Sequence, residues 1–261
     1  MPSPEYTLNQ AGDPRTERPR LALLERYYDP QTIARFERLG VARGWRCVDV
    51  GAGGGSIARW LAERTGSSGS VLAIDLDITL LEPLASAVLS VRRLDIRSQE
   101  LPGNADLVHA RFVLEHLPDR DAVLQRLIRG LRPGGLLVVT DADFRSIRLS
   151  EPDAAFDRVA QAFFRATRAA GWDPEFGAAL PSMLEAAGLE DVCAESFQTF
   201  QRGGVAGPLT ATTFVRLRDL LVQHGVTAAD IARVEKTMHS AGYYSPTSWT
   251  AWGRRPSTSE T

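Results

Sequence analysis

Asp49-Val50-Gly51-Ala52-Gly53-Gly54-Gly55 is a glycine-rich stretch at the end of a short apolar run, residues 47–50. Residues 56–64 follow with apolar side chains at helical spacing, so the stretch joins a strand to a helix. Gly51 and Gly53 let the backbone turn tightly and approach a ligand with no Cβ in the way. We expect the loop and the start of the following helix to offer unpaired N–H groups to that ligand. The stretch therefore predicts a nucleotide-binding turn.

Alternating strand and helix patterns surround this turn. Further strands are predicted at residues 71–75, 91–96, 105–110 and 136–140, and helices at residues 21–28, 32–39, 80–87 and 121–129. Repeated strand–helix units with apolar strands are typical of a doubly wound α/β fold, in which helices cover both faces of a mostly parallel sheet.

The second half of the chain has a different pattern. Helices are predicted at residues 152–170, 178–187, 210–222 and 228–239, and strands at 192–200 and 248–253. We interpret this half as a helical lid inserted among the late strands of the sheet. The predicted division is an N-terminal arm with helices over the ligand (1–40), a binding core (41–144), the lid with the last strands (145–255) and a loose tail (256–261).

Three acidic residues near the turn indicate what it binds. Asp49 comes two residues before the first glycine, Asp75 ends the next predicted strand, and Asp95 lies in Leu94-Asp95-Ile96 at the end of the third. Asp75 is placed to accept hydrogen bonds from ribose hydroxyls. Asp95 can bind an adenine amino group while Ile96 packs on the ring.

A nicotinamide dinucleotide is the competing ligand. The Asp49 carboxylate would repel a pyrophosphate, whereas it suits a cationic amino acid. Ser56 stands where the dinucleotide fingerprint has a glycine. The pattern therefore favours an adenosine that carries an amino acid.

The bulk composition restricts the partners. Lys and Arg number 30 against 32 Asp and Glu, which gives a net charge of −2, and the pI is about 6.1. A global basic field that could hold nucleic acid is therefore lacking. Cys47 and Cys193 are far apart in sequence, as expected of reduced thiols in an intracellular protein. No apolar run is long enough to cross a bilayer, and the N-terminus lacks the apolar core of a signal peptide. We expect a cytoplasmic protein without nucleic-acid or membrane partners.

These motifs resemble the class I S-adenosylmethionine-dependent methyltransferases, in particular the small-molecule methyltransferases of actinobacteria. The resemblance covers residues 6–144 well and the remainder more loosely. Its strongest segments are Gly44-Trp45-Arg46-Cys47-Val48-Asp49-Val50-Gly51-Ala52-Gly53-Gly54-Gly55-Ser56, then Asp106-Leu107-Val108-His109-Ala110-Arg111, and Leu131-Arg132-Pro133-Gly134-Gly135-Leu136-Leu137. It implies a seven-stranded sheet whose last strand, residues 248–253, runs antiparallel.

The resemblance also implies roles for individual residues toward S-adenosylmethionine. Gly51, Ala52 and Gly53 would lie along the methionine part, with Asp49 nearby and Arg111 close to the sulfonium. Asp75 would hold the ribose diol, with Leu76 against the adenine and Asp95 and Ile96 at its edge. Relatives carry a Tyr near the start and an Arg ahead of the first helix, and Tyr6 and Arg20 stand in those places, where they could contact the methionine carboxylate. The alternative is a frayed terminus with solvated charges.

Methyl transfer from a sulfonium needs mainly alignment of the acceptor and exclusion of water, although a hydroxyl or ammonium acceptor must also lose a proton. His116 is the candidate base, because histidine titrates near neutrality; packing is the alternative role. Asp143 is the second catalytic candidate, since it ends the fifth predicted strand. Asp141 and Phe144 beside it, with Tyr28 and Phe164, are candidate contacts to an aromatic or polyketide-like acceptor, although most of these aromatics also suit the lid core. The scattered histidines match no metal-ligand spacing.

Several functions remain open on this basis. The leading hypothesis is methyl transfer from S-adenosylmethionine to O, N or C of a small secondary metabolite. A second is a non-methylating step, such as a cyclisation, on the same cofactor-binding fold. A third is a nicotinamide-dependent oxidoreductase. Formation of a homodimer is a further hypothesis.

Overall fold

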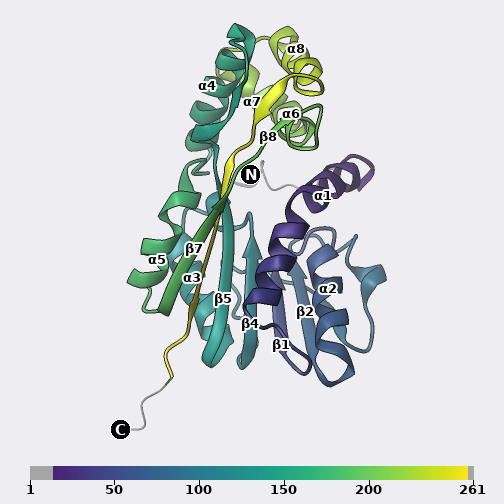
Figure 1. Ribbon diagram of the computed structural model, residues 1–261, viewed down its shortest axis with the longest axis vertical. Helices are drawn as coiled ribbons and strands as arrows, with labels where there is room; N and C mark the ends of the chain where they lie inside the picture. Colours follow the sequence, from purple (N-terminus) through teal and green to yellow (C-terminus); the bar gives the residue numbers. More distant parts are fainter. Residues whose placement is uncertain (1–13, 258–261) are drawn as a thin grey trace.

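A seven-stranded sheet forms one half of the molecule, and a mainly helical lid forms the other (Figure 1). The computed structural model describes residues 14–257 of the 261. The strands of the sheet are β1 (Arg46–Val50), β2 (Ser70–Asp75), β3 (Leu89–Arg93), β4 (Ala105–Arg111), β5 (Leu131–Asp143), β7 (Glu190–Phe197) and β10 (Thr247–Arg254). They lie in the order β3-β2-β1-β4-β5-β10-β7, and β10 is antiparallel to both of its neighbours. The predicted doubly wound fold with an antiparallel last strand is confirmed.

Side chains that alternate along the strands place apolar groups on both faces of this sheet. Cys47 and Val71 point to the face covered by α1 (Pro14–Arg38) and α2 (Ser56–Thr65). Val48 and Val50 point to the opposite face, which α3 (Arg120–Gly130) and α5 (Leu180–Ala186) cover. Burial on both faces is the reason that these strands read as continuous apolar runs.

The lid has its own apolar core and a small second sheet. Its helices are α4 (Ala154–Ala169), α6 (Ala206–Arg216), α7 (Arg218–Gln223) and α8 (Ala228–Met238). Its strands are β6 (Arg148–Leu149), β8 (Phe200–Arg202) and β9 (Gly242–Tyr244), paired in the order β6-β9-β8. Phe156, Phe163, Phe214 and Tyr243 are buried between these elements. The lid segments enter between β5 and β7 and between β7 and β10, as Figure 1 shows.

The largest difference from the sequence prediction is α1, which is one helix of 25 residues and not two short ones split at Pro30. Proline removes one backbone hydrogen bond and disfavours a helix interior. Here tertiary contacts compensate, because Tyr27, Tyr28 and Phe36 are buried on the same helix. Figure 1 shows that α1 is bent along its length, as expected of a helix with an internal proline.

Three further element predictions are wrong in detail. Residues 80–87 contain only a short 3-10 turn, η3 (Glu82–Leu84), because Pro83 lies within them. The strand predicted at residues 91–96 begins and ends earlier, so that Asp95 follows β3. The helix predicted at residues 210–222 is divided into α6 and α7. The other 3-10 turns are η2 (Gly66–Ser68), η4 (Leu114–His116), η5 (Phe144–Ser146) and η6 (Phe176–Ala179).

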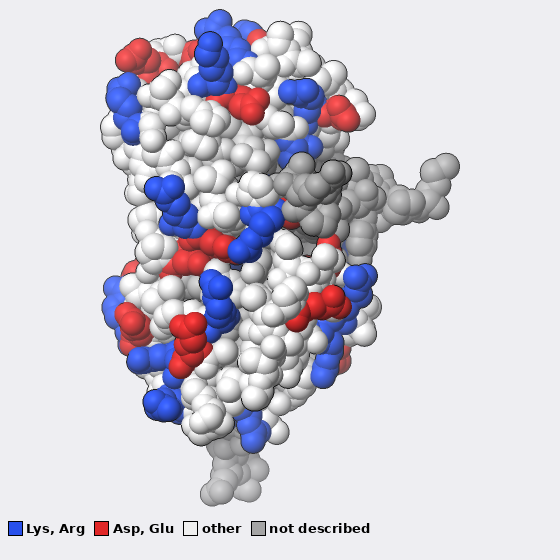
Figure 2. Space-filling model, turned by 90° about the vertical axis from the view of Figure 1, so that its right-hand side faces the viewer, with Lys and Arg blue, Asp and Glu red and all other residues white. Residues whose placement is uncertain are grey.

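Acidic and basic side chains are intermixed on the face shown in Figure 2. Within residues 14–257, no helix combines the length and the apolar character needed to span a membrane. In the same part of the chain, no three His, Cys, Asp or Glu side chains are grouped in a way that could hold a metal ion.

Candidate active site

A cavity of about 710 Å³ opens at the carboxyl ends of the central strands. Its wall is formed by α1, by the segments that follow β1, β2, β3 and β4, and by Arg216 of α6. β1 lies between β2 and β4, so the strand order reverses here, and α/β sheets bind ligands at such a point. Many of the predicted site residues line the cavity: Arg20, Gly51, Ala52, Gly53, Asp75, Leu76, Asp95, Ile96, Arg111 and His116.

The glycine loop after β1 adopts backbone conformations that side chains rarely permit. Gly51 and Gly53 have φ values of 66° and 57°. A Cβ on Gly51 would lie 2.6 Å from Cγ2 of Val113, which is too close for any side chain. Glycine is therefore required here both by the turn and by the segment that packs against it.

Three backbone N–H groups of this loop, which we expected to face a ligand, are used within the protein. Ala52 N–H donates to Ile74 O (3.1 Å), and Gly55 N–H donates to Ala52 O (2.8 Å). Gly53 N–H donates to the Asp75 carboxylate (2.9 Å). A pyrophosphate needs such donors, and these three are not free to bind one. The loop serves instead to orient Asp75.

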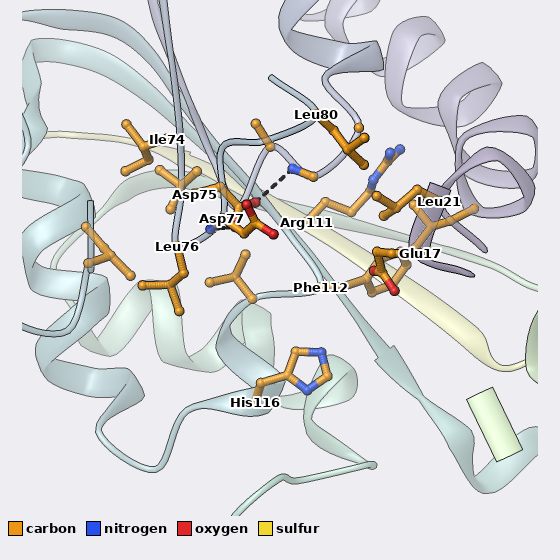
Figure 3. A pocket seen from close by; sticks show the side chains of 18 of the residues that line it. Glu17, Leu21, Ile74, Asp75, Leu76, Asp77, Leu80, Arg111, Phe112 and His116 are labelled. Carbon is orange, nitrogen blue, oxygen red and sulfur yellow. Dashed lines mark hydrogen bonds between the residues drawn. The ribbon is translucent and has the colours of Figure 1, made fainter. Parts of the chain in front are cut away.

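Asp75 is a carboxylate of the cavity wall that backbone hydrogen bonds hold in place (Figure 3). In addition to Gly53 N–H, it accepts a hydrogen bond from Asp77 N–H (3.2 Å). Burial raises the pKa of Asp75, and the two backbone donors oppose part of this rise. The carboxylate is thus held in a fixed direction at the end of β2, where two hydroxyls of a ribose could donate to it.

Leu76, Leu94 and Ile96 form an apolar wall next to Asp75. Asp95 lies in the loop after β3, where it accepts a hydrogen bond from Arg97 N–H (2.9 Å). This combination of flat apolar surface and carboxylate suits an adenine ring.

On the other side of the cavity, Glu17 of α1 joins two arginines. It forms ion pairs with Arg20 (2.6 Å) and with Arg216 of α6 (2.9 Å), so α1 and the lid are connected there. Glu17 lies beside Phe112, across the cavity from Ile74 and Leu76 (Figure 3). The predicted contact Tyr6 lies outside the described residues.

Asp49 and Arg111 are directed away from the roles we expected. Asp49 does not line the cavity; its buried carboxylate contacts His109 Nδ1 (2.7 Å), next to it on β4. Arg111 lines the cavity, but its guanidinium donates to Asp29 (2.8 Å) and to Thr32 (3.0 Å) of α1.

His116 is the one predicted catalytic residue that lines the cavity. Its ring packs against Trp172 of the lid core, with 4.7 Å between the centroids, and its Nδ1 is buried without a hydrogen-bond partner among the described residues. Burial, with Arg20 and Arg216 nearby, lowers the pKa of His116 to about 3. His116 is therefore a neutral side chain at physiological pH.

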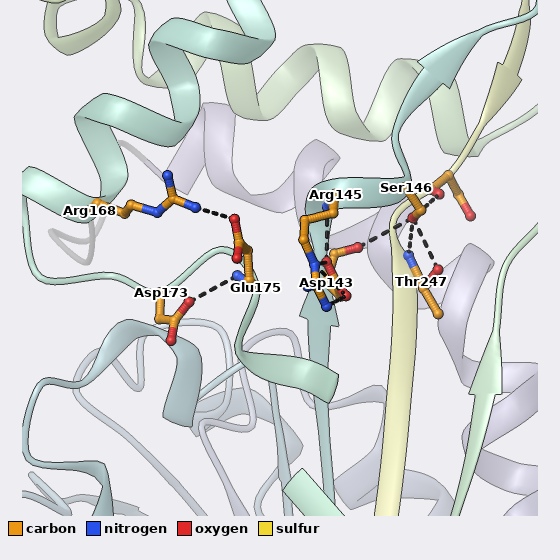
Figure 4. Close-up of polar contacts among 8 residues, drawn as sticks. Asp143, Arg145, Ser146, Arg168, Asp173, Glu175 and Thr247 are labelled. Carbon is orange, nitrogen blue, oxygen red and sulfur yellow. Dashed lines mark hydrogen bonds and ion pairs between the residues drawn. The ribbon is translucent and has the colours of Figure 1, made fainter. Parts of the chain in front are cut away.

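Asp143 and the predicted acceptor contacts lie outside the cavity wall. Arg145 holds the Asp143 carboxylate in an ion pair (2.6 Å), as Figure 4 shows. Phe144 and Phe164 pack around Phe163 in the lid core, and Tyr28 is buried against Tyr27 and Phe112. Asp141 is fully buried. The lid packs over these positions and separates them from the cavity. The sequence contains no signal that shows how the lid packs against the sheet.

Several residues of the site were missed by the sequence analysis. Glu17, Leu21, Glu25 and Phe112 line the cavity. Glu115, next to His116, is buried and lies against it, with 3.5 Å between Oε1 and Nε2. The α1 residues were missed because their place in the cavity wall depends on how α1 packs against the sheet. Glu115 is adjacent to a quoted candidate but resembles an exposed helix residue.

Comparison with known proteins indicates the class of protein to which this chain is similar. Residues 48–139 match the family model described as "Methyltransferase domain". The chain is 35% identical over 118 residues to Methyltransferase GfsG of Streptomyces halstedii, a stretch that covers 41% of each chain. The matched stretches span about half or less of the lengths of the first such relatives (41%, 51% and 52%).

Two solved structures have the same fold. A structure assigned as a methyltransferase, from Bacillus halodurans, superposes with a TM-score of 0.57 at 17% identity, covering 86% of this chain and 98% of that one. The cyclase SpnF superposes with a TM-score of 0.55 at 22% identity, covering 88% and 81%. Through its fold and the family model over residues 48–139, the chain is similar to the class I S-adenosylmethionine-dependent methyltransferases.

Proposed function

We propose that the protein transfers the methyl group of S-adenosylmethionine to O, N or C of a small-molecule acceptor of the secondary-metabolite kind. The observation that supports this most is the hydrogen bond from Gly53 N–H to Asp75. It uses a loop donor that a pyrophosphate would need, and it directs a carboxylate toward the place of a ribose. The named methyltransferase relatives support the same activity.

The residues of the cavity fit this cofactor. Asp75 would bind the ribose hydroxyls, Leu76 and Ile96 would enclose the adenine, and Arg20 would face the methionine carboxylate. When bound, the cofactor supplies an activated methyl group on a positively charged sulfur. The protein's part is to align the acceptor and exclude water, and the lid that meets α1 at Glu17 and Arg216 closes that side.

Calorimetry with S-adenosylhomocysteine tests the cofactor assignment. Asp75→Asn removes a charged acceptor of two hydroxyl hydrogen bonds, so we expect the dissociation constant to rise about tenfold or more. The control is Asp157→Asn, which makes the same chemical change on the exposed surface of α4. If the wild-type protein binds no S-adenosylhomocysteine, or binds NAD more tightly, the proposed function is wrong.

A non-methylating reaction, such as a cyclisation, is the alternative function, because the cyclase SpnF has the same fold. Mass spectrometry of a turnover mixture separates the two. Methyl transfer produces S-adenosylhomocysteine in step with product, whereas a cyclisation leaves the cofactor unchanged.

A further inference from the structure

One face of α1 lines the cavity. Its residues recur at the spacing of a single helix face: Glu17, Arg20, Leu21, Leu24 and Glu25. Figure 3 shows Glu17 and Leu21 of this face at the cavity. Leu21 approaches the glycine loop so closely that a Cβ on Gly53 would lie 3.3 Å from its Cδ2. Glu25 follows one turn later, so this face brings an acidic side chain to the loop.

The carboxylate of Glu25 lies directly against the glycine loop. A Cβ on Gly54 would lie only 2.0 Å from Oε1 of Glu25. Gly53 and Gly55 have positive φ values, but Gly54 does not, so the turn itself does not require glycine at this position. Gly54 is explained instead by the close approach of Glu25, because any side chain there would displace the carboxylate.

Glu25 is largely buried, and its charge is poorly compensated. Its side chain is 17% exposed, whereas Arg18, with which it forms an ion pair at 3.4 Å, is 50% exposed. An ion pair with so exposed a partner contributes little. Burial raises the pKa of Glu25, and the charges of Arg18, Arg111 and Arg59 offset this rise only in part. A positively charged ligand group next to Oε1 would therefore be stabilised.

The proposed cofactor brings such a group into the cavity. The methionine part of S-adenosylmethionine carries an α-ammonium and an α-carboxylate on one carbon atom. An ammonium group that leaves water without a counter-ion costs much free energy. We had expected Asp49 to supply that counter-ion, but its carboxylate contacts His109 Nδ1 (2.7 Å) and does not line the cavity. The ammonium group therefore needs a different acid.

The other acids of the described cavity wall have different surroundings. Glu17 is held by two arginines. The remaining three lie at or after the ends of β2 and β3, where the proposed ribose and adenine positions are: Asp75, Asp77 and Asp95. Glu25 is therefore the acid of this wall that remains for the amino-acid end of the cofactor.

We propose, on the basis of the proposed cofactor, that Glu25 binds the α-ammonium group of S-adenosylmethionine and makes the site selective for a ligand that carries an amino acid. Arg20, on the same face of α1, would face the α-carboxylate. One helix face then presents a carboxylate and a guanidinium to the two charges of the amino acid. The glycine loop lies beside them without a side chain at Gly54, so that Glu25 can reach this position.

Calorimetry with two ligands tests this assignment. The first is S-adenosylhomocysteine, and the second is its deamino analogue, in which a hydrogen atom replaces the ammonium group. Glu25→Gln keeps the size of the side chain but removes its charge, so we expect the dissociation constant for S-adenosylhomocysteine to rise about tenfold or more. The variant should bind the deamino analogue at least as tightly as the wild-type protein does, because the group that needs the charge is absent.

A third ligand shows that the charge of Glu25 acts on the ammonium group and not on the carboxylate. The decarboxylated analogue of S-adenosylhomocysteine keeps the ammonium group, so Glu25→Gln should weaken its binding by a similar factor. The matched control is Glu37→Gln, the same change on an exposed residue of α1, which should bind all three ligands as the wild-type protein does.

Two results would overturn the proposal. One is an unchanged affinity of Glu25→Gln for S-adenosylhomocysteine, and the other is an equal loss of affinity for this ligand and for the deamino analogue. Either can occur in a protein that binds S-adenosylhomocysteine well, and then the proposed function stands while this inference fails. A wild-type protein that binds none of the three ligands contradicts both.

Discussion

At the scale of single residues, Phe112 carries backbone strain at the wall of the cavity. Its φ of 56° lies in the left-handed region, which an aromatic residue rarely adopts. Phe112 N–H donates to Thr140 O (2.7 Å), and the ring packs edge-on against Tyr28, with 4.7 Å between the centroids. Strain of this kind persists where the surroundings impose it, and it is often found at functional sites. Here it directs an aromatic ring toward the cavity.

Comparison of two variants at this position measures the strain. Phe112→Gly and Phe112→Ala both lose the ring, but only glycine adopts the left-handed conformation freely. We expect the glycine variant to be the more stable of the two by about 1 kcal/mol in urea denaturation. Val113, with a φ of −117°, is the control, and there alanine should be the more stable. The same order at both positions would contradict the assignment of strain to Phe112.

At the scale of elements, an ion pair and a hydrogen bond join α1 to the end of β4. The Arg111 side chain is 9% exposed and Asp29 is 18% exposed, so their ion pair is largely removed from water. Arg111 also donates to Thr32, one turn further along α1. These bonds bracket Pro30 and hold the helix in register where its own backbone lacks a donor. The position of Glu17, Leu21 and Glu25 in the cavity wall depends on this attachment.

Removal of the Asp29 carboxylate should destabilise the protein, because a buried guanidinium then loses its counter-ion. We expect Asp29→Ala to lower the free energy of unfolding by about 3 kcal/mol. The double variant Asp29→Ala, Arg111→Met should recover part of this loss, because no buried charge is then left unpaired. Urea denaturation of the three proteins provides the measurement. A double variant at least as unstable as the single one would show that the pair does not act in this way.

At the scale of the whole molecule, the junction of sheet and lid contains two buried carboxyl groups, those of Glu115 and Asp141. A carboxyl group whose pKa is raised by folding binds more protons in the folded state than in the unfolded state. The resulting stability is greatest at acid pH and is lost as the pH rises toward the folded-state pKa. For Asp141 the window ends at about 8.

Denaturation at several pH values tests this linkage. The free energy of unfolding should fall between about pH 5 and pH 8, by at most about 1.4 kcal/mol per pH unit for each proton concerned. Asp141→Asn should make the dependence shallower, because an amide does not titrate. Equal slopes for the two proteins would mean that Asp141 is ionised in the native state over this range.

Local patterns were sufficient to predict the central strands and the ligand edge of the sheet. β1, β2 and β4 read as buried apolar runs, and Asp75 at the end of β2 follows from the strand–turn–helix logic around Gly51 and Gly53. Local patterns failed where a residue's neighbours come from distant segments. Pro30 looked like a helix boundary because the support from Arg111 is 81 positions away. Asp143 is a different case, because its partner Arg145 is only two positions along the chain but the pairing depends on how the chain turns after β5.

The sequence by itself determined the fold class and the Asp75 side of the cavity, because periodicity, glycine freedom and strand-end carboxylates act within short stretches of chain. The tertiary structure decided the use of the loop N–H groups, the course of α1 and the roles of the acids near His116. These depend on burial and on contacts between β4, β5, α1 and the lid. Whether a carboxyl group such as Glu115 holds a proton depends on its burial and on the charges around it. Neither can be predicted from the residues next to it in sequence.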